Sequence, residues 1–236
     1  MPRIFDNISE PFSQALVATL QSCQRADFCV GYFNLRGWRL LQPSIEGWSG
    51  AENNRCRLLI GMQRAPQDEL RQLFSLLGSD AEQVDAQRVV RLKRQIIEEF
   101  RRQLMLGAPT NQDEQGLRDL ARQLREGKVV VKLFLRHPLH AKLYLMHRED
   151  YNTPTLSFLG SSNLTLSGLS YQGELNTEIT DYDAGRKLSD WFDARWLDQR
   201  CLDISTDLIE VIEESWARED QLTPYEVYLK MAYHLA

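Results

Sequence analysis

The chain has 236 residues, of which 43% are hydrophobic and 26% charged, and its formal net charge is −5. This composition is typical of a globular protein, and no apolar run approaches the roughly 20 residues that a membrane-spanning helix requires. The acidic balance argues against a protein that coats nucleic acid with its whole surface. The four cysteines show neither CxxC nor metal-ligand spacing, which favours a reduced, cytoplasmic setting. No membrane contact, metal or other cofactor is expected.

The first sixty residues predict a βαβ unit. Apolar residues recur at every fourth position between Ile8 and Gln24, which indicates an amphipathic helix. The apolar runs 28–33 and 57–61 predict strands, and residues 35–41 between them predict a short helix. This order favours an α/β fold in which a mixed sheet is sandwiched between helices.

Residues 67–126 are rich in Leu, Arg, Gln and Glu, and they predict three helices inserted between strands. After Gly127 strands are predicted at residues 129–135, 141–146, 156–159 and 175–180. Helices follow at 183–197 and 205–219, and Thr223 before Pro224 starts another. We therefore expect a catalytic domain over residues 1–182, with a helical insertion at 67–126, and a helical extension or connector over residues 183–236.

Polar side chains cluster beside two of the later strands. His140 and Lys142 share a face because alternate residues of a strand point the same way, and Ser161 and Asn163 do so after the next strand. A nucleophile, a cation and hydrogen-bond donors are what attack on a phosphodiester requires. Glu174, eleven residues after Asn163, is expected to accept a hydrogen bond from one nitrogen of His140 and leave the other free to attack.

His140-x-Lys142 followed by Gly160-Ser-x-Asn163 resembles the HKD signature of the phospholipase D superfamily, and the strands near residues 30 and 60 extend the resemblance more loosely. The resemblance implies a phosphohistidine intermediate at His140. It also implies that Lys142 and Asn163 bind the phosphate oxygens, that Ser161 supports them, and that Glu174 orients the histidine. The signature often has an aspartate five positions after its lysine, where this chain has His147.

The implied mechanism needs two histidines, one that attacks and one that protonates the leaving oxygen. The chain contains a single His-x-Lys pair. The expectation is therefore a homodimer in which two His140 side chains meet across a two-fold axis.

The substrate is expected to be nucleic acid and not lipid, because no exposed apolar segment suits a lipid surface. DNA is expected rather than RNA. Residues 158–165 and 174–178 look most like phospholipase D modules attached to DNA helicases in bacterial restriction and phage-defence proteins. The chain has no GxxxxGK[ST] motif, so a helicase motor would lie in a longer chain or in a separate partner. The expected activity is metal-independent endonucleolytic cleavage in restriction or antiviral defence.

Further phosphate contacts are expected from Gly160, where the backbone can come close to a bound phosphate, and from Ser162. A basic cluster that includes Arg88, Arg91 and Arg94 is expected to add others. Glu98 and Glu99 are interspersed in that cluster, so a solvated, salt-bridged helix face is an alternative interpretation.

Other functions remain open at this point. The chain could be a catalytically degenerate phospholipase D-like module that only binds nucleic acid or dimerises. It could also be a metal-dependent nuclease that uses Asp119, Glu126 and Lys128, which supply the carboxylates and lysine of such enzymes.

Overall fold

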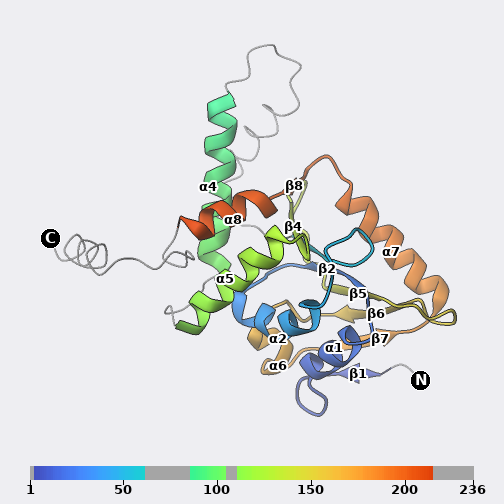
Figure 1. Ribbon diagram of the computed structural model, residues 1–236. Coiled ribbons are helices and arrows are strands. Elements are labelled where there is room, and N and C mark those ends of the chain that lie inside the picture. The colour runs from blue at the N-terminus through green and yellow to red at the C-terminus, as the bar shows by residue number, and fades with distance from the viewer. Residues whose placement is uncertain (1–2, 62–85, 105–110, 215–236) are drawn as a thin grey trace.

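The structure is a computed structural model that describes residues 3–61, 86–104 and 111–214 (Figure 1). The strands are β1 (Ile4–Phe5), β2 (Arg25–Val30), β3 (Cys56–Ile60), β4 (Val129–Phe134), β5 (Leu143–His147), β6 (Thr155–Gly160), β7 (Asn176–Ile179) and β8 (Cys201–Asp203). The helices are α1 (Phe12–Leu20), α2 (Leu35–Ile45), α4 (Ala86–Leu104), α5 (Asn111–Arg125), α6 (Leu166–Ser170), α7 (Tyr182–Trp196) and α8 (Ser205–Glu213).

The strands form one eight-stranded mixed sheet in the order β1-β7-β6-β5-β2-β3-β4-β8. β2, β3 and β4 are parallel, and every other neighbouring pair is antiparallel. The amino end of β5 therefore lies beside the carboxyl ends of β2 and β6, since Leu143 pairs with both Cys29 and Leu159. This edge of the sheet brings the predicted catalytic segments together.

Helices cover both faces of the sheet, as the α/β prediction required (Figure 1). Alternate residues of the central strands pack on α1, α2, α4, α5, α6 and α8 in the larger core. The opposite face, with Leu59 and Leu145, packs on Phe192 and Trp196 of α7 in a smaller core. Among the described residues, no helix is long and apolar enough to cross a membrane.

The strands predicted after Gly127 are present, as is the βαβ unit, with boundaries shifted by a few residues. Of the insertion, α4 and α5 are described, while residues 62–85 and 105–110 lie outside the described part of the chain. The last predicted helix, at Thr223, also lies outside it. The short elements β1, β8 and α6 were not predicted. β8 pairs with β4, and α8 contributes to the larger core, so the packing of the described residues shows no break near residue 182.

α1 begins at Phe12 and not at Ile8, where its apolar periodicity starts. The Asp6 carboxylate accepts hydrogen bonds from the backbone N–H groups of Ile8, Ser9 and Glu10, which holds this segment in a turn. Pro11 then occupies the extended N-cap position of the helix. The local capping chemistry thus overrides the periodic pattern.

A buried ion network joins the far ends of β2, β3 and β5 to α7. Asp27, fully buried, accepts hydrogen bonds from Arg25 (2.7 Å), Arg57 (2.6 Å) and His147 (2.7 Å). Arg57 also donates to Asp193 (2.7 Å). His147, which stands where the HKD signature often has aspartate, therefore has a carboxylate partner on the neighbouring strand.

Replacing Asp27 with asparagine should destabilise the protein by about 3–5 kcal/mol at neutral pH, because buried cations lose their counter-charge. Burial raises the pKa of Asp27, but the hydrogen bonds from Arg57, His147 and Arg25 outweigh it and hold the pKa well below 3.8. This stabilisation is complete above the unfolded pKa and is lost as pH falls toward the folded one. Urea unfolding should therefore show a wild-type advantage that shrinks below about pH 4; parallel pH curves would contradict this account.

Candidate active site

The His140–Lys142 segment lies just before β5, at the edge where β2, β3 and β6 end. Its approach to β3 depends on Gly61. The Leu139 N–H donates to the Gly61 carbonyl (2.9 Å), and a Cβ on Gly61 would lie 2.0 Å from the Leu139 carbonyl oxygen. A side chain at position 61 would therefore displace the segment that carries the histidine.

His140 and Lys142 contact each other. Lys142 Nζ lies 2.7 Å from His140 Nε2 and donates to the His140 carbonyl (3.1 Å). The imidazole is exposed, whereas Lys142 is only 3% exposed. Because an ammonium has no acceptor lone pair, the charged Lys142 fixes Nε2 as the acceptor and leaves the proton of a neutral imidazole on Nδ1. The nitrogen beside the lysine is thus the nucleophilic one.

Burial lowers the pKa of Lys142, and the negative charge of Glu174 partly opposes this shift. A cation in a poorly solvated position interacts strongly with any anion that enters. Lys142 is therefore well placed to hold a phosphate oxygen beside Nε2.

Asn163 follows β6 and faces the same edge. Its Oδ1 accepts a hydrogen bond from the Tyr32 N–H (2.9 Å), on the loop after β2. This bond ends β2 at Val30, short of the predicted residue 33, because the Tyr32 N–H is directed to Asn163. It also orients the amide so that Nδ2 remains the donor available to an anion.

The rest of the Gly160-Ser-Ser-Asn163 turn is tied to β7. Ser161 Oγ accepts from the Leu175 N–H (2.9 Å), and the buried Ser162 hydroxyl accepts from Asn176 Nδ2 (2.8 Å). A Cβ on Gly160 would lie 2.3 Å from the Leu175 carbonyl oxygen. Gly160 and Ser162 therefore hold the turn against β7, and the close approach at Gly160 is to that strand.

Glu174 is half-buried and close enough to Lys142 to affect its pKa. Between His140 and Glu174 no hydrogen bond is present in the described part of the chain. The backbone of Glu174 is fixed by the N-terminal loop, since its N–H donates to the Asp6 carbonyl (3.3 Å). Asn7, with a positive φ of 60°, donates to the carbonyls of Gly168 and Gln172 (2.9 Å each).

The sequence profile described as "Cardiolipin synthase, PLD-like domain" matches residues 16–196. The chain belongs to the phospholipase D-like family. None of the curated protein sequences compared with the chain matches it.

Three solved structures are similar to this chain at low sequence identity. Phosphatidylserine synthase from Haemophilus influenzae is 16% identical with a TM-score of 0.50, over 99% of this chain and 45% of that one. NucT from Helicobacter pylori is 10% identical (TM-score 0.46, over 86% and 98%). Nuc from Salmonella typhimurium, a phospholipase D family member, is 9% identical (TM-score 0.48, over 86% and 97%). The predicted mixed α/β, phospholipase D-like fold is confirmed.

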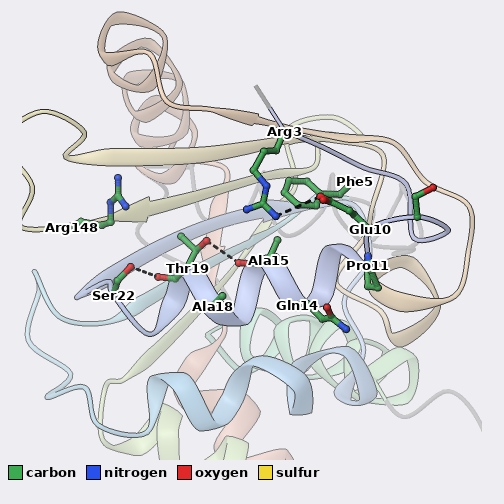
Figure 2. Close-up of a pocket in the computed structure, with 11 residues that line it drawn as sticks. Arg3, Phe5, Glu10, Pro11, Gln14, Ala15, Ala18, Thr19, Ser22 and Arg148 are labelled. Atoms are coloured by element: carbon green, nitrogen blue, oxygen red, sulfur yellow. Dashed lines mark hydrogen bonds and ion pairs between the residues drawn. The ribbon is translucent and has the colours of Figure 1, made fainter. Parts of the chain in front are cut away.

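Family membership supports phosphodiesterase activity. A groove of about 540 Å³ lies elsewhere on this phospholipase D-like domain and is lined by other residues (Figure 2). It runs along α1, where an ion pair joins Arg3 to Glu10 (3.5 Å), with Arg148 at its other end. None of the predicted catalytic side chains lines it.

The predicted basic cluster lies on α4. Arg91 is exposed, and the side chain of Arg88 lies outside the described part of the chain. Arg94 pairs with Glu98 (3.1 Å) and with Glu214, the C-cap residue of α8. Its charge is thus partly compensated, as the salt-bridged interpretation of this face expects.

The residues of the metal-dependent alternative lie at the end of α5 among cations. Arg122 pairs with Asp119 (3.3 Å), and Lys128 pairs with Glu126 (2.7 Å). Within residues 3–61, 86–104 and 111–214, no group of three His, Cys, Asp or Glu side chains could hold a metal ion. The carboxylates are engaged in ion pairs that maintain this surface.

The sequence analysis did not single out Tyr32 or Asn7. Tyr32 contributes its N–H to Asn163, and its ring lies against His140 with centroids 6.3 Å apart. Asn7 anchors the segment that leads to Glu174, and its Oδ1 accepts from the first N–H of α1, at Phe12 (2.9 Å). The Asp-Asn pair at positions 6 and 7 is typical of a turn, which was the one local signal for this loop.

Proposed function

We propose that this protein is a metal-independent nuclease that cleaves DNA phosphodiesters through a phosphohistidine intermediate. The observation that carries the proposal is the 2.7 Å contact between Lys142 Nζ and His140 Nε2. Asn163 is linked to the same place through Tyr32, whose N–H it accepts and whose ring contacts His140. The contact provides a nucleophilic nitrogen and a cation at one point. A phosphate oxygen that replaces Nε2 as the partner of Lys142 brings phosphorus next to the ring nitrogen.

The reaction then proceeds in two displacements. The Nε2 lone pair attacks phosphorus, the N–P bond forms, and the P–O bond to the leaving nucleoside breaks. The leaving oxygen takes a proton from a second imidazole, and Glu174 stabilises the positive ring of His140. Water, deprotonated by that second imidazole, attacks phosphorus and breaks the N–P bond, which regenerates His140.

The second imidazole would come from a second copy of the chain, because each chain has one His-x-Lys pair. An uncovered part of the sheet supports this. Ile4 (59% exposed) and Leu159 (40%) both pair with Thr177 and so lie on one face, which α7 leaves open, and Leu175 (63%) continues it. We name Ile4, Leu159 and Leu175 the edge patch. Leu175 binds Ser161 and adjoins Glu174, so the edge patch is continuous with the site.

The same proposal includes a role in restriction or phage defence beside a helicase motor. Its support is the resemblance of residues 158–165 and 174–178 to helicase-associated modules. The partner motor would deliver DNA to a site that carries no ATPase motif of its own.

The test is cleavage of labelled DNA in excess chelator, with the reaction stopped in denaturant. We expect cleavage to persist and a labelled protein–DNA adduct to appear, stable in alkali and labile in acid like a phosphoramidate. Mass spectrometry should map it to the peptide that contains His140. DNA binding without cleavage would support the degenerate module, and cleavage only with added metal would support the alternative at Asp119, Glu126 and Lys128.

A further inference from the structure

The aromatic ring of Tyr32 lies beside His140, where a substrate would bind. It is half-buried, and it meets the His140 ring edge to face, with centroids 6.3 Å apart and planes at 75°. Its hydroxyl makes no hydrogen bond to the described residues. An aromatic ring that is partly exposed beside a nucleophile can contact a ligand bound there.

Two backbone hydrogen bonds hold the loop that carries Tyr32, one at Tyr32 itself and one at Asn34. The Tyr32 N–H donates to Asn163 (2.9 Å), and the Asn34 N–H donates to the Leu164 carbonyl (3.0 Å). Phe33, between them, is buried between Trp38 and Phe100, with ring centroids 6.0 and 6.2 Å away. Tyr32 is therefore held in place before any substrate arrives, which lowers the entropic cost of using it for binding.

We infer that Tyr32 stacks on the nucleobase next to the scissile phosphate, so that the site takes an unpaired nucleotide; this rests on the nuclease function proposed above. Attack requires phosphorus within about 3–3.5 Å of the nucleophilic nitrogen. A base is joined to its phosphate by a single sugar, so the neighbouring base falls in the region of the Tyr32 ring. Every base has a π-face, whereas a base in a duplex must first leave its stack to offer it.

The experiment uses dinucleotides, because one phosphodiester fixes the position of the cut. The intact dinucleotide is compared with two analogues that lack the base on one side or the other, for wild type, Tyr32→Ala and Tyr32→Phe. Tyr151→Ala is the matched control, since Tyr151 is 99% exposed in the loop after β5. Thermal melting of each variant checks that the fold is retained.

Tyr32→Ala should raise KM for the intact dinucleotide about tenfold with little change in kcat, the effect of losing one stacked base. On one of the two abasic analogues the same substitution should have almost no effect, because the partner of the ring is already absent. Tyr32→Phe should match the wild type, and the preference of the wild type for single-stranded over duplex DNA should shrink in Tyr32→Ala.

Equal losses on all three substrates, or a loss in Tyr32→Phe as large as in Tyr32→Ala, would overturn the stacking role while the nuclease function stands. If wild type cleaves neither the dinucleotides nor long DNA, the proposed function fails and Tyr32 fails with it.

Discussion

Replacing His140 with alanine should reduce DNA cleavage by more than about 10⁴-fold, and replacing Lys142 with methionine by about 10³-fold, both in excess chelator. The first change removes the nitrogen that bonds to phosphorus. The second removes a buried cation that lies 2.7 Å from that nitrogen, where a phosphate oxygen gains most from a charge. Initial rates on labelled DNA under single-turnover conditions would measure both losses.

The stability of Lys142→Met separates a chemical from a structural effect. Because burial lowers the pKa of Lys142, the charged side chain costs folding free energy below its unfolded pKa. Methionine removes that cost at similar volume, so the variant should unfold at the same or a higher urea concentration while it loses activity. Lys128→Met is the matched control: Lys128 pairs with Glu126, and its loss should leave cleavage unchanged. Loss of cleavage in Lys128→Met but not in Lys142→Met would favour the metal-dependent alternative.

The same lysine predicts the alkaline limb of the pH profile. The cation is lost as pH rises through its lowered pKa, so the affinity for a non-cleavable phosphodiester, which needs no proton donor, should fall at a pH below the 10.5 of an ordinary lysine. Glu174 raises the pKa of Lys142, and Glu174→Gln should therefore move this limb to still lower pH. A limb that does not move would show that Glu174 acts on another group.

The sequence was sufficient to predict the parts of this fold that depend on local pattern. The apolar runs that became β2, β3 and β4 alternate or are continuous as buried strands must be, and the HxK and GSxN motifs stand at strand ends. Because β5 runs antiparallel to β2 and β6, those motifs meet at one edge. The sequence thus supplied the motifs, and the strand order, which it did not predict, brings His140, Lys142 and Asn163 to the same edge.

What the sequence did not reveal depends on contacts between residues far apart in the chain. β1 and β8 are two and three residues long, and they are strands only because β7 and β4 offer edges to pair with. Tyr32 and Asn163 are 131 positions apart, and Asp27 and His147 are 120 apart. No period or spacing encodes such pairs, so neither the role of Tyr32 nor the acid that serves His147 could be predicted.

Changing both Leu159 and Leu175 to glutamate should convert the protein to a monomer and reduce cleavage at least a hundredfold, if the second imidazole comes from a second copy. Both side chains belong to the edge patch and are exposed in the single chain, so the substitutions leave its core intact. In the dimer they would place like charges opposite one another. Sedimentation would measure the oligomeric state. Leu197→Glu, which alters a leucine 77% exposed at the end of α7, is the matched control and should change neither property.

Mixing chains tests the shared site without altering its surface. When wild type and His140→Ala exchange subunits at equal amounts, about one quarter of the dimers keep two intact histidines. If one site needs both, the activity per wild-type chain should fall by about half after exchange. Unchanged activity per wild-type chain, or an active Leu159→Glu, Leu175→Glu monomer, would mean that a group within one chain protonates the leaving oxygen. A single chain would then carry out the whole reaction with one His140, and the edge patch would have no role in catalysis.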